Sequence, residues 1–166
     1  IVESQAKQQE YIVVSQEEKI HWTIPVMIEG KMIKVKVEGF ADRIGLVGDQ
    51  LQLVDYKTGN VTNTELGFKT WDELAEKPIK SKAFQLALYG YVYLMQNPDM
   101  NDFVAGIYSF RNLKSGLLQL TWNRKVVTAN DLRENFPYVI EKIVHKMVGS
   151  SNKFEHNPDA KYCNYC

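Results

Sequence analysis

Two aspartates and one lysine in the first half of the chain have the types and spacing that could do chemistry. Asp55 and Lys57 lie two positions apart at the end of an apolar run, and Asp42 precedes them. Residues i and i+2 of a β-strand project to the same face, so Asp55 and Lys57 would emerge together. Neighbouring carboxylates repel each other unless a cation lies between them, and their hard oxygens suit Mg²⁺ or Mn²⁺. A lysine beside such an ion can orient an attacking water or stabilise charge on a phosphate.

A β-hairpin is expected to bring the two aspartates together. Residues 34–46 alternate in part between apolar and polar side chains, residues 47–50 form a turn, and residues 51–56 return as a strand. If the two central turn residues close the hairpin, Asp42 falls roughly opposite Asp55. Two carboxylates and a lysine would then converge on one spot.

An isolated D-x-K has a more ordinary interpretation. Asp55 and Lys57 would form a surface strand pair, and Asp42 would pair with Arg43 or a lysine. The longer string argues against this, because a Leu-Gln-Leu-Val strand delivers Asp-Tyr-Lys-Thr-Gly after Gly-x-x-Asp-Arg-Ile.

The string resembles motifs II and III of the PD-(D/E)XK nuclease superfamily, in the RecB-like branch that contains the AddB- and RecB-type nuclease domains. That branch reads G-x-x-D-R-I-D, followed by a hydrophobic strand that ends in D-Y-K-T-G. The chain matches at Gly39, Asp42, Arg43, Ile44 and residues 55–59, and it departs at Gly45, where the branch has a second acid.

The resemblance implies a site. Asp42, Asp55 and Lys57 would be the catalytic residues. Asp42, Asp55 and the backbone carbonyl of Tyr56 would hold Mg²⁺ or Mn²⁺, and Lys57 would orient the attacking water.

A second motif lies downstream, where residues 81–96 are expected to form a helix with Ser81 as its cap. Gln85 and Tyr89 are four residues apart and share one face of this helix. Taken alone, they would be polar residues at the border of a core helix. The stretch also resembles motif IV of the RecB-like branch, Q-L-x-x-Y, which implies that Gln85 and Tyr89 position substrate or the catalytic lysine.

The remaining pattern predicts an α/β or α+β chain. The expected elements are strands at 11–14, 21–28, 103–110 and 117–122, turns at 29–31 and 113–116, a long polar connection at 60–78 containing a short helix capped by Thr70, and a helix at 131–148 capped by Asn130. Pro25 would lie at an edge or a bulge. The resemblance implies a restriction-endonuclease-like αβββαβ core, in which a mixed central sheet is flanked by helices and residues 103–110 pair beside the D-x-K strand.

The upstream metal ligand of the family has no convincing counterpart. A glutamate on a strand before motif II could be Glu17 or Glu18, although a solvated charged turn explains this pair equally well. For the histidine or glutamate that an upstream helix supplies, Glu3 and Glu10 are weak counterparts, and the residue could precede Ile1.

Cys163 and Cys166 form a C-x-x-C pair in the tail at 150–166. Such a pair alone is half a metal site, a redox pair or two free thiols. In part of the RecB-like branch, C-terminal cysteines and one upstream cysteine bind an iron–sulfur cluster. The upstream cysteine is absent here, and two thiolates cannot complete a four-thiolate site, so we expect no cluster in this chain.

Composition is that of a globular protein. The chain has 166 residues, 45% hydrophobic and 24% charged, which suits one domain over residues 1–166, and its start at Ile1 suggests a fragment of a longer protein. With 20 basic and 20 acidic residues its net charge is zero, which counts mildly against an autonomous DNA-binding surface. No apolar run is long enough to span a membrane, and a cytoplasmic location is expected.

These observations predict a metal-dependent DNA nuclease. The resemblance implies an exonuclease that acts in DNA repair or recombination, with DNA as substrate and a helicase domain or subunit as partner. The alternative is a non-catalytic DNA-binding or docking module, favoured by the neutral charge and the missing upstream acid. The intact Asp42, Asp55 and Lys57 disfavour it. A structural β-hairpin domain is a third alternative, which would leave the Gln85 and Tyr89 match to coincidence.

Overall fold

The computed structural model of the chain describes residues 11–149. In chain order its elements are β1 (Tyr11–Ile28), β2 (Lys31–Val47), β3 (Gln50–Lys57), α2 (Asn63–Leu66), β4 (Gly67–Phe68), α3 (Asp72–Glu76), η1 (Pro78–Lys80), α4 (Ser81–Gln96), β5 (Phe103–Ser109), η2 (Phe110–Ser115), β6 (Leu118–Gln119), β7 (Thr121–Trp122), β8 (Lys125–Val126) and α5 (Ala129–Gly149). The predictions for Glu3, Glu10, Cys163 and Cys166 lie outside these residues.

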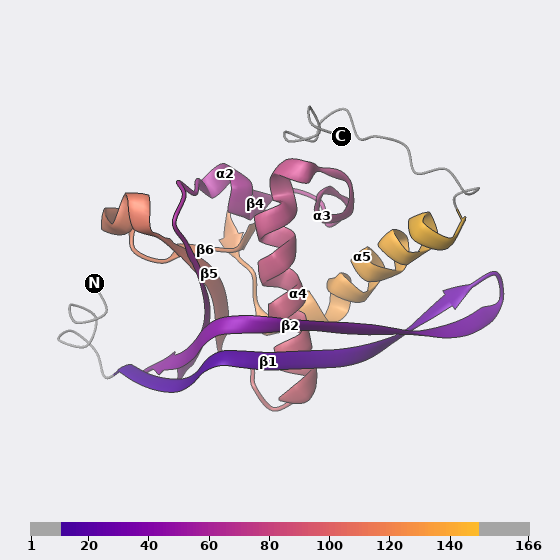
Figure 1. Ribbon diagram of the computed structural model, residues 1–166, viewed down its shortest axis with the longest axis horizontal. Coiled ribbons are helices and arrows are strands. Elements are labelled where there is room, and N and C mark those ends of the chain that lie inside the picture. Colours follow the sequence, from indigo (N-terminus) through magenta and orange to yellow (C-terminus); the bar gives the residue numbers. More distant parts are fainter. Residues whose placement is uncertain (1–10, 150–166) are drawn as a thin grey trace.

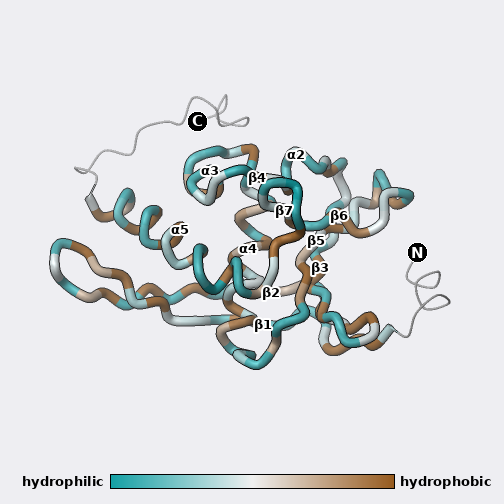
Figure 2. The backbone as a smooth tube through the Cα atoms, turned by 180° about the vertical axis from the view of Figure 1, so that it is seen from behind, coloured by the Kyte–Doolittle hydropathy of each residue, from teal (hydrophilic) through white to brown (hydrophobic). Residues whose placement is uncertain are grey.

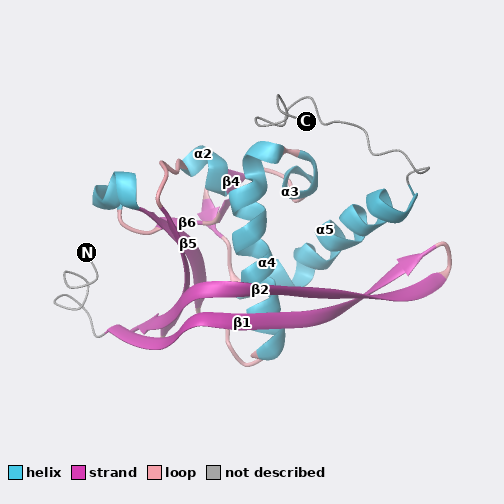
Figure 3. Cartoon of the chain, in the orientation of Figure 1, coloured by secondary structure: helices cyan, strands magenta, loops and turns pink. Residues whose placement is uncertain are grey.

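A five-stranded mixed sheet organises the fold. Its strand order is β1-β2-β3-β5-β6, in which β3 and β5 are parallel and the other neighbours are antiparallel. Helix α4 packs across β1, β2, β3 and β5, and α5 packs on α4 and against β1 (Figure 1, Figure 3). This arrangement confirms the predicted mixed sheet flanked by helices, with Phe103–Ser109 beside the D-x-K strand.

Strands β1 and β2 form a long ribbon that runs from the sheet out beneath α5 (Figure 1). The turn at Glu29 and Gly30 lies where it was predicted. The prediction of two separate strands was wrong, because β1 is continuous and its polar stretch at 16–19 pairs with β2. Backbone pairing to β2 therefore overrides the local polarity. Pro25 pairs with Lys34 in this edge strand, where a missing N–H is tolerated.

The face that β2 turns toward the helices changes partway along the strand. Ile33, Val35 and Val37 pack on the core from odd positions, as does buried Ala41, whereas Ile44 enters the same core from an even position. Side chains alternate along a strand, so the alternation shifts by one residue between Ala41 and Ile44. Asp42 lies within this shift, and its charge acts on Asp55 of the neighbouring strand.

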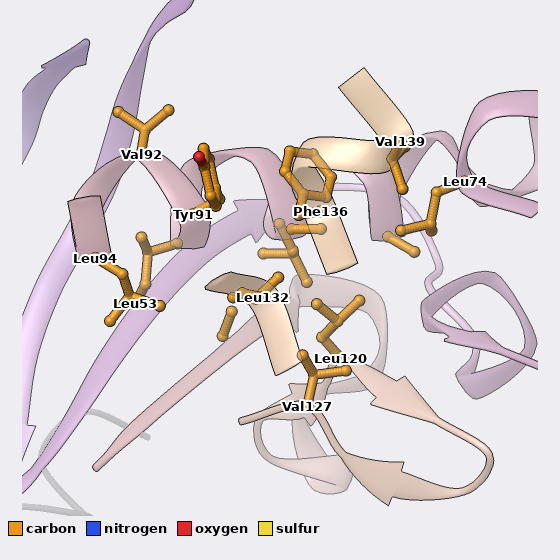
Figure 4. Close-up of a cluster of buried hydrophobic side chains, with 14 of the residues drawn as sticks. Leu53, Leu74, Tyr91, Val92, Leu94, Leu120, Val127, Leu132, Phe136 and Val139 are labelled. Carbon is orange, nitrogen blue, oxygen red and sulfur yellow. The ribbon is translucent and has the colours of Figure 1, made fainter. Parts of the chain in front are cut away.

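The core lies between the sheet and the two long helices. All residues of β5 are buried, as expected for a parallel strand covered on both faces. Figure 2 shows the apolar stretches of β3 and β5 in the middle of the molecule. Leu53 of β3, Tyr91 of α4, and Leu132 and Phe136 of α5 belong to the buried cluster drawn in Figure 4. Among residues 11–149, no helix has the length and apolar content needed to cross a membrane.

Short elements account for most of the remaining differences from prediction. The expected strand at 117–122 breaks at Leu120, so β6 joins the main sheet while β7 pairs with β4 and β8 in a three-stranded sheet. Residues 113–115 of the expected turn belong to η2, and the connection at 60–78 contains α2, β4 and α3 and ends where η1 begins. These pieces are too short to show a hydrophobic period, and tertiary contacts such as Trp71 on Phe68 and Trp122 hold them.

The three predicted helix caps were wrong. Helix α4 follows directly on η1, so its cap position is Lys80 and Ser81 is already helical. The cap position of α3 is Trp71 rather than Thr70. At α5, Thr128 Oγ1 accepts a hydrogen bond from Asp131 N (3.2 Å) and Thr128 N donates to Asp131 Oδ2 (2.9 Å), which places Asn130 inside the first turn.

Gly90→Ala should destabilise the protein although alanine is the better helix former. A Cβ at position 90 would lie 2.8 Å from Phe103 Cζ and 2.9 Å from Leu132 Cδ1, so these two buried side chains would have to shift within a packed core. Overpacking of this kind outweighs the helix-propensity gain and should cost about 1–2 kcal/mol, measured by urea unfolding. The matched control is Gly149→Ala in α5, where the new Cβ meets no atom of residues 11–149 within 4 Å. Equal stability of Gly90→Ala and the parent would contradict this packing.

Candidate active site

The hairpin between β2 and β3 positions both aspartates. It closes through Gly48 and Asp49, with Val47 paired to Gln50, as the sequence predicts. The register continues to the pair Arg43 and Val54, so Asp42 and Asp55 are the next residues across the two strands.

Asp42 is fixed to the neighbouring strand. Its Oδ2 accepts a hydrogen bond from the backbone N of Tyr56 at 2.8 Å. Its Oδ1 makes no hydrogen bond within residues 11–149. One carboxylate oxygen thus anchors the side chain, and the other is available to a ligand.

Asp55 is a buried carboxylate with one cationic neighbour. Its residue is 3% exposed. Lys57 Nζ lies 3.2 Å from Asp55 Oδ1 in a hydrogen bond and 3.0 Å from Oδ2. The Lys57 side chain keeps 31% of its surface exposed, so its ammonium group is within reach of solvent and substrate. Burial rules out an ordinary surface strand pair.

Gln85 of α4 connects the aspartate to the lysine. Its Oε1 accepts a hydrogen bond from Lys57 Nζ (3.2 Å), and its Nε2 donates to Asp55 Oδ1 (3.2 Å). The amide also donates to the Tyr89 hydroxyl at 3.4 Å. The two residues on one face of α4 therefore meet the end of β3, and Gln85 restricts where the lysine can point.

Tyr89 explains why β2 has a glycine three residues before Asp42. A Cβ at position 39 would lie 2.6 Å from Tyr89 Cε1, so the ring lies directly on the strand backbone. A side chain at position 39 would displace the Tyr89 ring, whose hydroxyl accepts a hydrogen bond from Gln85. The glycine is therefore part of the positioning of the site.

Electrostatics at Asp55 favour a bound cation. Burial raises the pKa of Asp55 above its ordinary value, and the nearby Asp42 charge raises it further, whereas the hydrogen bond and charge of Lys57 lower it. The surroundings of Asp55 therefore stabilise its ionised form less than water does. A positive ion between the two aspartates would relieve this cost.

The donor set fits a hard divalent cation. Asp55 Oδ2 is buried and accepts no hydrogen bond, because Lys57 approaches it outside hydrogen-bond geometry. Over residues 11–149, no group of three or more His, Cys, Asp or Glu side chains gathers. Two carboxylates are nevertheless enough for Mg²⁺, which usually keeps several waters and takes one or two carboxylates plus substrate phosphate.

Neither strand glutamate joins the two aspartates. Gln16 pairs with Arg43 and Glu18 pairs with Ala41, so Glu17 lies across from Asp42 in β1. Both glutamates are exposed, and Glu17 has a left-handed backbone with φ 48°. They lie in a paired strand rather than in the solvated turn considered from the sequence.

Arg43 is a buried feature that sequence reasoning missed. It is 4% exposed and packs over the rings of Tyr11 (4.9 Å), Tyr56 (5.3 Å) and Tyr108 (5.7 Å). Its pairing with Val54 places it on the face opposite Ile44, so it does not pair with Asp42. The signal was available, since neighbouring residues of a strand point to opposite faces.

Ser109 is a second missed residue. Its buried Oγ donates to the backbone carbonyl of Gly59 at 2.8 Å and so ties the end of β5 to the segment that follows Lys57. No local pattern pointed to it, because the contact joins residues far apart in the sequence.

A comparison with known families agrees with this geometry. The model of the PD-(D/E)XK nuclease superfamily matches residues 2–166. No curated protein and no solved structure gives a significant match. The superfamily prediction is confirmed over almost the whole length, and the RecB-like branch stays a prediction. The chain belongs to the PD-(D/E)XK nuclease superfamily.

Proposed function

We propose that this protein is a nuclease that hydrolyses DNA phosphodiester bonds with the help of Mg²⁺ or Mn²⁺. Members of the superfamily are typically nucleases. The observation that carries the proposal is the buried Asp55 carboxylate, held against Lys57 and Gln85 and lying across from Asp42.

Each residue has a role that follows from its contacts. Asp42 Oδ1 and Asp55 Oδ2 accept no hydrogen bond from residues 11–149 and would hold the cation, together with the Tyr56 carbonyl. A bound divalent cation neutralises charge on the scissile phosphate and makes water a stronger nucleophile. Lys57 would orient the attacking water with its partly exposed ammonium group.

Gln85 and Tyr89 would act by positioning. Gln85 accepts from Lys57 and donates to Asp55, so it keeps the ammonium group beside the metal ligand. Tyr89 receives a hydrogen bond from the Gln85 amide and lies on β2 at Gly39. Misplacing a catalytic group by an ångström can cost about a hundredfold in rate, so this support matters.

The RecB-like motifs support a finer proposal. By that resemblance the enzyme would be an exonuclease of DNA repair or recombination, formed as one nuclease domain that works beside a helicase domain or subunit. These points rest on the motifs around Asp42, Asp55 and Gln85 alone.

A non-catalytic DNA-binding or docking module is the second candidate. The observation that favours it is that only two carboxylates converge among the described residues. A docking module would have the same fold but would not cleave DNA with a metal ion, so a cleavage assay separates the two candidates.

Lys57→Met should lower metal-dependent DNA cleavage by about a hundredfold or more, because the group that orients the water is lost. Mn²⁺ binding, followed by calorimetric titration, should persist because both carboxylates remain. The matched control is Lys82→Met in the first turn of α4, a lysine of similar exposure (29% against 31%) that pairs with Glu65 instead. Cleavage by Lys57→Met at the parental rate would sink the assignment.

Asp55→Asn should raise the metal-free melting temperature at neutral pH. Because the pKa of Asp55 is raised in the folded protein, its carboxyl group favours folding at low pH and disfavours it once the pH rises above the folded pKa. The advantage of the variant should shrink as the pH falls through the titration of Asp55. Added Mn²⁺ should raise the melting temperature of the parent and have little effect on the variant.

The control for this experiment is Asp49→Asn, which changes an exposed aspartate in the turn between β2 and β3. Its melting temperature should follow the parent with and without Mn²⁺. An Asp55→Asn protein that is less stable than the parent at neutral pH without metal would show that Asp55 is a structural carboxylate.

A further inference from the structure

A large basic pocket lies outside the carboxylate site. It has a volume of about 1220 Å³ and is formed by α2, β4, the approach to α4, and the segments around β6 and the β7–β8 turn. Its lining includes Lys69, Lys77, Lys80 and Arg124 against the single acidic residue Glu73.

Two of these cations are free to meet a ligand. Lys80 is buried and donates to the backbone carbonyls of Thr64 and Gly67, and Lys77 pairs with Glu73 at 3.3 Å. Within residues 11–149, neither Lys69 nor Arg124 makes an ion pair, and both are exposed. The pocket therefore carries uncompensated positive charge.

The stretch of sequence that contains Arg124 is basic. Residues 103–130 contain Arg111, Lys114, Arg124 and Lys125 and no acidic residue, in a chain whose net charge is zero. Of these four residues Arg124 lines the pocket, where together with Lys69 it raises the local potential and attracts anions. The neutral total thus hides a basic region.

The position of Arg124 requires an uncommon backbone. Asn123 and Arg124 form the turn between β7 and β8 with φ values of 50° and 66°. A two-residue hairpin turn requires left-handed φ at both central residues, so the turn itself fixes the backbone from which the Arg124 side chain extends. Asn123 N donates to Phe68 O at 2.9 Å, so the turn is held against β4 beside the pocket.

A chain connection and an ion pair link the pocket to the carboxylate site. Its lining residues Asn63 and Thr64 belong to α2, which follows Lys57 after a short connection. Lys82, one helical turn before Gln85, pairs with Glu65 of α2. Figure 1 shows α2, β4 and the first turns of α4 gathered at the same end of the molecule.

We propose that this pocket binds the phosphate backbone of a single DNA strand beside the catalytic centre, chiefly through Lys69 and Arg124. The inference rests on the proposed nuclease function and adds a strand preference to it. A basic concave surface can follow a flexible single strand, whereas duplex grooves admit protruding helices or ribbons.

The test measures binding separately from cleavage. The probe is a fluorescein-labelled oligothymidine of about a dozen nucleotides, followed by anisotropy at several salt concentrations, once in EDTA and once with Ca²⁺. The double variant Lys69→Gln/Arg124→Asn should bind about tenfold more weakly at low salt, with the slope of log K against log salt reduced by about 1.4. Asparagine is chosen because it tolerates the left-handed backbone of residue 124.

The matched control is Lys31→Gln/Lys34→Gln, which removes the same charge from two exposed lysines at the far end of the β1–β2 ribbon. It should bind like the parent, and unlabelled single strand should compete better than duplex. Melting temperatures check folding, and if the double variant is unfolded, Lys69→Gln alone should still weaken binding.

Several results overturn the inference: no binding by the parent in either buffer, equal losses in both double variants, unchanged binding in the pocket variant, or stronger competition by duplex. The two proposals fail separately. If the parent binds through the pocket but does not cleave with Mg²⁺ or Mn²⁺, the binding site is supported and the nuclease function is contradicted. If the parent cleaves and the pocket variant binds normally, the nuclease function is supported and the binding site is contradicted.

Discussion

The burial of the Asp55 carboxylate is the constraint on which the rest of this structure depends. A carboxylate that is 3% exposed loses most of its hydration, and its raised pKa records that cost. Lys57 and Gln85 offset only part of it. An apolar residue at the end of this central strand would avoid that cost, and the cation site that we propose would account for an acid there.

Close approach of α4 to the sheet makes this arrangement possible. Gly39 lets the Tyr89 ring lie on β2, and Gly90 lets the helix pack tightly on Phe103 and Leu132. The bond from Tyr56 N to Asp42 Oδ2 fixes the Asp42 carboxylate beside β3, where its charge acts on Asp55. Packing that looks structural thus sets the distances on which the chemistry depends.

Charge is distributed unevenly around the centre. Asp55 lies on the helix-facing side of the sheet, Arg43 is buried among tyrosine rings on the other face, and free cations line the pocket near α2. A zero net charge therefore says little about how this protein meets a polyanion, since local potential rather than the total guides a charged ligand.

Local sequence was enough to determine the β2–β3 hairpin, the shared face of Gln85 and Tyr89, and the two long helices, because period and turn chemistry act over a few residues. The motif strings also identified the superfamily and the residues that converge at the site. Tertiary structure alone decided the continuity of β1, the break at Leu120, the helix starts, and the places of Arg43 and Ser109. Those features depend on contacts between distant segments, which outweigh weak local preferences, and the basic pocket depends on them in the same way.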